Sequence, residues 1–489
     1  MSLRTNERTA LRRGILFVLG LTLWRVILLI FDRTELFVDE AQYWFWGQNL
    51  DFGYYSKPPL IAWIIRAVTD LAGSDSPFWV RLPAPLFHMG TALVLMAVAR
   101  RLYGLRAAAW AGPVYVTLPM VSVGAALFST DTPMLFFHAL AILLWLKLQQ
   151  RTTVPLAAAL GFAVGLGLMA KYAMIYFVLG AGLAGLFIPA ARIPRPAALI
   201  AAAVALAVIA PNIWWNIRTG GITIEHMLYN AEWHAAGAAP GLAGALRFLA
   251  EQFVVFGPIM FAAYLLLILR TPFGLRLPHA GLLLWLSAPV TMLMAAQGTL
   301  GSANANWGVA AYTGASVLVT AWLLARARAL LWLGQGLHLL LALALPILTA
   351  LAPDLRRDDG RQWLHRYLGR AETSQTLART ARENGLDIIV SASRDLAADL
   401  HYTLRERREL KLYALPRPGF PASYYEQRFP VPPDTDRPVL LASLNRPPAC
   451  ATRVLARWTP QDGALAGRVI LASLVAPDCL KMLLREGLQ

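Results

Sequence analysis

Apolar stretches long enough to cross a bilayer follow one another along most of this chain. A transmembrane helix needs about 20 apolar residues, because its backbone polar groups must be hydrogen-bonded within the segment. Stretches near this length lie at residues 14–31, 78–99, 107–128, 132–149, 155–170, 172–190, 196–214, 247–269, 280–297, 305–325 and 329–352. Only 15% of the 489 residues are charged, which excludes an ordinary soluble protein. The sequence predicts an all-α polytopic membrane domain over residues 1–352, with about eleven transmembrane helices.

Basic residues give these helices an orientation. Arg12 and Arg13 precede the first stretch, which has no small-residue cleavage site after it, so we expect a retained signal-anchor helix with a cytoplasmic N-terminus. Lys or Arg then occurs in each connection that this topology places in the cytoplasm, as the positive-inside rule requires. The same rule explains much of the net charge of +16, so no nucleic-acid partner is expected.

Acidic residues point to the opposite face. Before residue 353, every Asp and Glu except Glu7 falls in, or at the edge of, a segment that this topology places outside. Avoidance of the membrane core explains part of this distribution, but it does not explain why the cytoplasmic connections have no carboxylates. We therefore expect a polar chemical site on the outer face.

The first outer connection, residues 32–77, is the best candidate for that site. It contains Asp39 and Glu40 together with three tyrosines, Tyr43, Tyr54 and Tyr55, that could line a substrate cavity. One carboxylate could accept a proton from a hydroxyl nucleophile. The alternative is that both carboxylates cap an interfacial helix at its positive N-terminal end.

Further polar residues could complete the site. Lys57 precedes Pro58, which restricts it to extended backbone, and a lysine at headgroup depth suits a phosphate. Snorkelling to lipid phosphates is the alternative for Lys57. Asp131 opens the fourth stretch and could cap its helix, with or without a role in the site. The remaining candidates lie at the edges of other stretches: Arg81, Lys171, Asn306 and Trp307.

The composition changes after residue 353. A charged linker, 353–360, precedes helical patterns at 363–368 and 377–383 and short apolar runs at 387–391, 410–415, 439–444, 453–458 and 469–474. These alternating patterns predict a small α/β domain over residues 353–489, outside the membrane on the same face as the first outer connection. Cys450 and Cys479 could form a disulfide in an oxidising compartment, but the sequence leaves their pairing open.

The motifs common in soluble enzymes are absent from the sequence. We find no phosphate-binding glycine loop, no clustered cysteine or histidine metal site and no nucleophile elbow, so neither a metal nor a cofactor is expected.

Several short motifs resemble, in order, those of the protein O-mannosyltransferase superfamily, and most closely its bacterial lipid A aminoarabinose transferase branch. They are Asp39-Glu40-Ala41-Gln42-Tyr43, Lys57-Pro58-Pro59, Asp131-Thr132-Pro133, Ala170-Lys171-Tyr172 and Ala305-Asn306-Trp307. The resemblance covers roughly residues 15–325 and implies a glycosyltransferase of the C-type fold.

The resemblance also implies roles. The donor would be a polyprenyl-phosphate sugar. The acceptor would be an envelope molecule: lipid A, lipopolysaccharide core, another glycan or a protein. Asp39 would be the catalytic carboxylate and Lys57 would contact the donor phosphate, while Asp131 would be a second acidic residue of the cavity. The enzyme would be embedded in the lipids of a bacterial inner membrane, with its C-terminal domain in the periplasm.

A transporter or flippase of a lipid-linked or anionic substrate is the alternative function. Transporters place ionisable groups near the bilayer midplane and are built from matching halves. Here the carboxylates cluster at one face and no second half mirrors the first, which favours the glycosyltransferase.

Overall fold

The computed structural model describes residues 2–230, 241–271, 277 and 279–487. Contacts divide the described chain into two compact units. The helical unit lies within residues 1–30, 56–64 and 81–347, and the α/β unit lies within residues 31–55, 65–80 and 348–489. The sequence placed the whole of residues 32–77 with the membrane domain, whereas most of that connection groups with the C-terminal residues.

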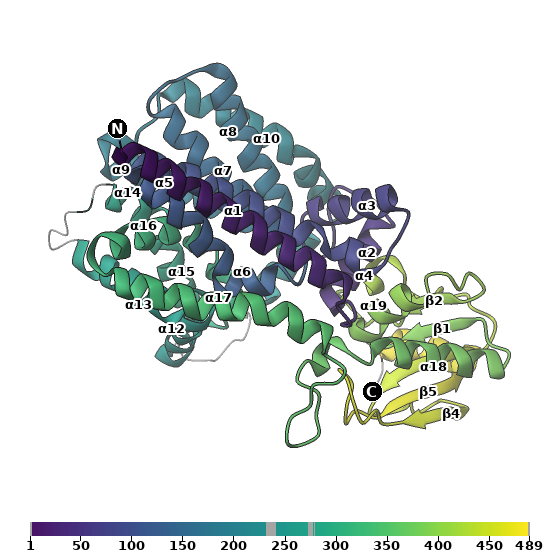
Figure 1. The fold of residues 1–489 in the computed structure, drawn as a ribbon. Coiled ribbons are helices and arrows are strands. Elements are labelled where there is room, and N and C mark those ends of the chain that lie inside the picture. Colours follow the sequence, from purple (N-terminus) through teal and green to yellow (C-terminus); the bar gives the residue numbers. More distant parts are fainter. Residues whose placement is uncertain (1, 231–240, 272–276, 278, 488–489) are drawn as a thin grey trace. The chain divides into compact units, whose positions relative to one another are not determined.

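The helical unit consists of long apolar helices joined by short connections (Figure 1). Its helices are α1 (Ser2–Ile30), α5 (Pro83–Thr117), α6 (Pro119–Gly124), α7 (Asp131–Leu148), α8 (Val154–Ala170), η1 (Tyr172–Met174), α9 (Ile175–Phe187), η2 (Pro189–Ala191), α10 (Arg195–Arg218), α11 (Ile222–Asn230), α12 (Leu242–Val255), α13 (Pro258–Arg270), α14 (Ala280–Trp285), α15 (Ala288–Leu300), η4 (Ala305–Gly308), α16 (Ala311–Arg326) and α17 (Arg328–Ala350). Helix α5 packs against α1 and α7, and α8 packs against α7 and α10.

The structure does not confirm the predicted count of about eleven spans. Six apolar helices of the described chain are at least 18 residues long: Thr5–Ile30, Pro77–Thr117, Asp131–Leu148, Arg195–Arg218, Ala280–Leu300 and Arg328–Ala350. Three shorter apolar helices are Val154–Ala170, Tyr172–Phe187 and Pro258–Arg270.

Two glycines interrupt helices of the helical unit. Gly104, with φ of 86°, kinks α5 between the stretches predicted at 78–99 and 107–128, and α5 ends at Thr117 before the second stretch does. Gly257, with φ of 91°, separates α12 from α13 inside the single stretch predicted at 247–269. Only glycine adopts such angles without strain, so the helix is interrupted at Gly257 although hydrophobicity continues there.

The first outer connection contains α2 (Val38–Gly47) and α3 (Leu60–Ala72), and α4 (Pro77–Arg81) begins at its last residue. Helix α3 is amphipathic, and its 13 residues are too few to span a bilayer. The division between the two units falls within α3 and again at the end of α4.

Five strands of the described chain form a mixed sheet in the order β2-β1-β3-β5-β4. They are β1 (Ile388–Ser391), β2 (Lys411–Ala414), β3 (Val439–Leu444), β4 (Arg453–Trp458) and β5 (Ile470–Val475). The sheet is parallel from β2 through β1 to β3, and β5 and β4 are antiparallel to their neighbours. Each strand coincides with a predicted apolar run, within one or two residues.

Side chains of β1 and β3 point alternately to two apolar layers. The helices of the unit are α18 (Arg370–Glu383), α19 (Arg394–Thr403), α20 (Tyr424–Arg428) and α21 (Pro477–Glu486), with the short η5 (His365–Tyr367). Ile389 and Leu440 pack with residues of α18 and α19, whereas Ile388, Val390 and Leu441 pack with α21. Because both faces are covered, β1 and β3 are continuously apolar. Helices α19, α20 and α21 were not predicted from the sequence.

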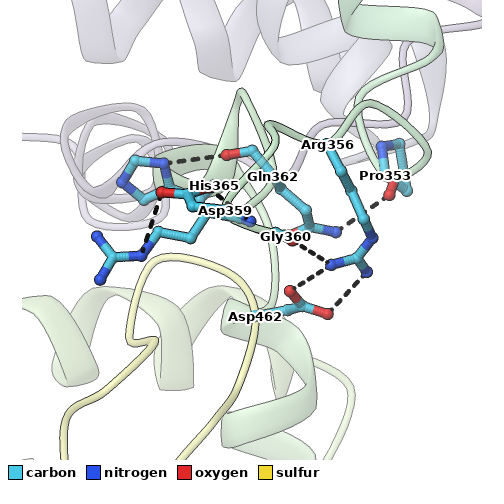
Figure 2. Close-up of polar contacts among 8 residues, drawn as sticks. Pro353, Arg356, Asp359, Gly360, Gln362, His365 and Asp462 are labelled. Atoms are coloured by element: carbon cyan, nitrogen blue, oxygen red, sulfur yellow. Dashed lines mark hydrogen bonds and ion pairs between the residues drawn. The ribbon is translucent and has the colours of Figure 1, made fainter.

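The charged linker after α17 is ordered within the α/β unit. Figure 2 shows Arg356 reaching Asp462 with both terminal nitrogens, each 2.8 Å from a carboxylate oxygen. Arg356 also donates a 2.9 Å hydrogen bond to the Gly360 carbonyl, and Gln362 donates one of 3.2 Å to the Pro353 carbonyl. The bidentate pair fixes the linker to the loop before β5.

A disulfide joins Cys450 to Cys479, with Cα atoms 5.5 Å apart. The sequence left this pairing open. The bond connects the segment after β3 with the first turn of α21, so it fastens that helix to its face of the sheet.

A buried ion pair connects α18 with α19. Arg370 Nη1 lies 2.8 Å from Asp399 Oδ2, and both side chains are less than a tenth exposed. The Glu35 carboxylate accepts hydrogen bonds from the backbone amides of Arg370 and Ala371, at 2.6 and 3.3 Å. A carboxylate at this helix N-terminus satisfies unpaired amides and suits the helix dipole. Burial raises the pKa of Asp399 to about 7, and attraction to Arg370 offsets only part of this effect.

We expect Asp399 to make the α/β unit less stable as the pH rises from about 4 to about 7. The unfolded chain releases the Asp399 proton near pH 4. The folded chain holds the proton until about pH 7. The free energy of unfolding therefore falls over this window, by up to about 4 kcal/mol. Asp399→Asn removes the titration, so its melting temperature should change less with pH than that of the wild type. Thermal unfolding of the full-length protein in detergent, followed by tryptophan fluorescence, measures the difference.

Asp387→Asn is the matched control, because Asp387 pairs with Arg437 at the surface of the same unit, with its side chain 41% exposed. Its pH profile should follow that of the wild type. Parallel profiles for Asp399→Asn and the wild type would contradict the prediction.

Candidate functional site

Helix α2 carries the carboxylate pair that the sequence singled out, and its two members have different surroundings. The buried Glu40 side chain accepts a 3.0 Å hydrogen bond from the backbone amide of Phe37, the residue before the helix. This contact closes the first turn, so Glu40 fills the capping role that the sequence left open. The Asp39 side chain, in contrast, is 45% exposed.

Asp39 forms an ion pair with Arg394, the first residue of α19. Arg394 Nη2 donates to Asp39 Oδ1, and Arg394 Nε donates a 2.8 Å hydrogen bond to Gln42 Oε1. Burial disfavours the charge on Arg394, but the nearby Asp39 carboxylate outweighs burial and raises the pKa of the guanidinium. The carboxylate and the arginine, 355 residues apart in sequence, are thus neighbours within the α/β unit.

Aromatic packing holds α2 against α19 and α20. The ring of Phe45 lies 4.2 Å from His401 and 5.5 Å from Tyr425, centroid to centroid. Burial lowers the pKa of His401 to about 3, so this histidine is neutral at physiological pH and packs as an aromatic ring. Trp44 contacts Tyr402 edge-on at 5.0 Å and donates a 2.8 Å hydrogen bond to Asp75.

The three tyrosines predicted to line a cavity are buried in this packing. Tyr54 stacks on Trp46 at 4.6 Å, and its hydroxyl donates to the Trp46 carbonyl at 2.9 Å. Burial raises the pKa of Tyr54. The Tyr55 hydroxyl donates to the Pro421 carbonyl at 2.8 Å, and Tyr43 lies 5.1 Å from Trp46. These contacts give the tyrosines a packing role within the α/β unit.

The helical unit contains a second polar cluster. Asp131, in the first turn of α7, pairs with Lys171 at 2.6 Å and accepts a 3.1 Å hydrogen bond from Asn306 of η4. The Asp131 and Lys171 side chains are 14% and 15% exposed. Lys171 has extended backbone where α8 ends and η1 begins, so a break in the helix turns its side chain toward Asp131. The structure thus brings together three of the residues predicted from the sequence.

The remaining predicted residues also belong to the helical unit. Lys57 and Trp307 are half-buried, and Arg81 is fully buried. Next to Lys171, the Tyr172 hydroxyl donates a 2.7 Å hydrogen bond to Asn212 and accepts one of 3.1 Å from Asn216. In the described part of the chain, no group of three or more His, Cys, Asp or Glu side chains is placed to hold a metal ion.

Sequence reasoning did not identify Arg394. Its local signal was the helix start that follows β1, where Ser393 caps α19 by accepting a 3.3 Å hydrogen bond from the amide of Leu396. That signal predicts a helix but not the tertiary partner of the arginine.

Chemically, the α/β unit offers a half-exposed carboxylate with a fixed cation, and the helical unit offers a lysine balanced by a carboxylate.

The sequence of this chain is similar to those of known glycosyltransferases. The family described as dolichyl-phosphate-mannose-protein mannosyltransferase matches residues 56–215. Lipid A galacturonosyltransferase RgtD of Rhizobium johnstonii is 45% identical over 478 residues, which cover 96% of this chain and 99% of the relative. Lipopolysaccharide core galacturonosyltransferase RgtA of the same organism is 29% identical over half of this chain and 48% of its own length.

The fold matches that of ArnT from Cupriavidus metallidurans, solved with bound undecaprenyl phosphate, with a TM-score of 0.63. The match covers 94% of this chain and 97% of the other, at 16% identity. The chain therefore belongs to the protein O-mannosyltransferase and lipid A aminoarabinose transferase superfamily, membrane glycosyltransferases of the C-type fold that use polyprenyl-phosphate-linked sugars.

Proposed function

We propose that this glycosyltransferase transfers a uronic acid sugar from undecaprenyl phosphate to lipid A, with Asp39 as its catalytic carboxylate. The observation that supports a catalytic role for Asp39 is its half-exposed carboxylate, which Arg394 holds on an otherwise buried helix. A carboxylate in this state can accept a proton while one of its oxygens is held in place.

The substrates are inferred from relatives. RgtD, which aligns over nearly the whole chain, is named a lipid A galacturonosyltransferase, and this supports a galacturonosyl donor and a lipid A acceptor. ArnT, with the same fold, was solved with undecaprenyl phosphate, which supports that lipid as the carrier.

The reaction is a substitution at the anomeric carbon of the donor sugar. Asp39 accepts the proton of the acceptor hydroxyl as the hydroxyl oxygen forms a bond to this carbon. The bond from the carbon to the phosphate oxygen breaks, and polyprenyl phosphate leaves with the bonding electrons. We propose that three cations stabilise the negative charge of this leaving group: Lys57, Lys171 and Arg81. Fixed cations stabilise charge as it develops in a transition state.

We place the reaction on the periplasmic side of a bacterial inner membrane. The positive-inside pattern puts the first connection and the C-terminal domain outside the cytoplasm. The Cys450–Cys479 disulfide supports the same side, since disulfides persist in oxidising compartments.

Asp39→Asn should reduce transfer by at least about 100-fold, because amide and carboxylate have the same shape but the amide cannot accept the proton. The assay counts free polyprenyl phosphate released from a radiolabelled lipid-linked sugar in detergent, with and without lipid A. A transporter would release none, so the assay also tests the alternative function.

Asp51→Asn is the matched control. Asp51 is another first-connection carboxylate that pairs with an arginine near the C-terminus, Arg428, at 3.1 Å. This variant should keep nearly wild-type transfer. Full activity in Asp39→Asn would refute the catalytic role of Asp39.

We expect Lys171→Gln to raise the KM for the lipid-linked donor about tenfold, because a phosphate loses a fixed positive charge. The single variant Lys171→Gln also leaves the mostly buried Asp131 carboxylate without its cation, which destabilises the fold. The double variant Asp131→Asn/Lys171→Gln removes both charges and should restore thermal stability but not donor affinity. A double variant with a wild-type donor KM would contradict a phosphate-binding role for Lys171.

A further inference from the structure

One cation holds two side chains of α2 at once. Asp39 and Gln42 are three residues apart, so they lie on the same face of the helix. The Arg394 guanidinium reaches both, with Nη2 toward Asp39 Oδ1 and Nε 2.8 Å from Gln42 Oε1. Because a guanidinium is a rigid planar fork, the contact with Gln42 fixes the orientation of the guanidinium, and Nη2 then holds the Oδ1 atom of Asp39.

The position of Arg394 is costly without this carboxylate. Arg394 opens α19, and the positive end of a helix disfavours a cation. An arginine at this place therefore needs an anion, and Asp39 supplies it.

The surroundings of the pair are rigid. Phe45 and Trp44, on the turn of α2 that follows Gln42, pack against His401 and Tyr402 of α19. The two helices thus hold each other at more than one point. These contacts fix the backbone of Arg394 relative to that of Asp39, and the hydrogen bonds to Asp39 and Gln42 hold the guanidinium itself.

The two oxygens of Asp39 are not equivalent. Arg394 engages Oδ1, while no described residue donates a hydrogen bond to Oδ2. The Asp39 side chain is 45% exposed and that of Arg394 is 38% exposed, so the pair is reached by solvent. One oxygen is held by the protein and the other is open to a substrate hydroxyl.

We propose that Arg394 is a positioning residue for the transfer reaction, which the C-terminal domain supplies to orient Asp39 with Oδ2 toward the acceptor hydroxyl. This inference rests on the proposed function, in which Asp39 is the base. A base that is oriented by a third group is a recurring arrangement in catalysis. Arg394 then acts through Asp39 and does not touch the donor.

The test compares Arg394→Ala with Arg428→Ala in the full-length protein. Arg428 also pairs with a carboxylate of the first outer connection, Asp51, and its replacement should be nearly silent. Arg394→Ala should lower kcat about 100-fold, the scale of a 1 Å displacement of a catalytic group, and leave the donor KM within about twofold of wild type. Added methylguanidinium should restore part of kcat in Arg394→Ala and should have no effect on Arg428→Ala or on Asp39→Asn.

Non-additivity gives the second readout. If Arg394 acts only through Asp39, the double variant Asp39→Asn/Arg394→Ala should be no slower than Asp39→Asn alone. A further loss in the double variant, an unchanged kcat in Arg394→Ala, or a loss confined to the donor KM would each overturn the proposal. If Arg394→Ala does not fold, Arg394→Lys decides. It keeps the charge without the fork, so an unchanged kcat overturns the proposal and a reduced kcat at wild-type donor KM supports it.

The outcomes separate this inference from the proposed function. Full activity in Asp39→Asn would remove the base and thus the proposed mechanism. An inactive Asp39→Asn enzyme combined with a normal Arg394→Ala enzyme would remove only the role of Arg394.

Discussion

The packing of α2 against α19 is the interaction on which the position of Asp39 within the α/β unit depends. Phe45 of α2 lies 4.2 Å from the neutral ring of His401, and Arg394 neutralises Asp39 at the start of α19. Aromatic rings pack between the two helices, and the ion pair joins their first turns. A segment between two membrane helices thereby becomes part of a domain that lies more than 300 residues later in the sequence.

This arrangement gives each unit a distinct chemical capability. The α/β unit holds a half-exposed carboxylate, and the helical unit holds Lys171 paired with Asp131. A lipid-phosphate sugar transferase needs a base for the acceptor and cations for the leaving phosphate. The family assignment and these two clusters agree on the class of reaction.

Patterns that depend on local sequence were predicted well. The five strands follow apolar runs, and Asp131, Lys171 and Asn306 were each identified from a short motif, although the sequence did not predict their mutual contact. Helix α19 was missed because its charged residues resemble a solvated surface, whereas Asp399 and Arg394 are neutralised by partners distant in sequence. The predicted count of spans is not confirmed, and Gly257 interrupts a helix within the span predicted at 247–269 without interrupting its hydrophobicity. Tertiary pairing and backbone angles are not encoded in a hydropathy pattern.

Hydrogen exchange of the full-length protein tests most directly whether α2 folds together with the C-terminal domain. Leu440→Ala removes a fully buried side chain of β3 and should cost about 2–5 kcal/mol of local stability. Amides of α2 and α19 should then lose protection together with those of β3, while α7 and α8 keep theirs. Leu160→Ala in α8 is the reciprocal control, and it should affect α7 and α8 but not α2. Unchanged protection of the α2 amides in Leu440→Ala, or a loss of their protection in Leu160→Ala, would contradict the account.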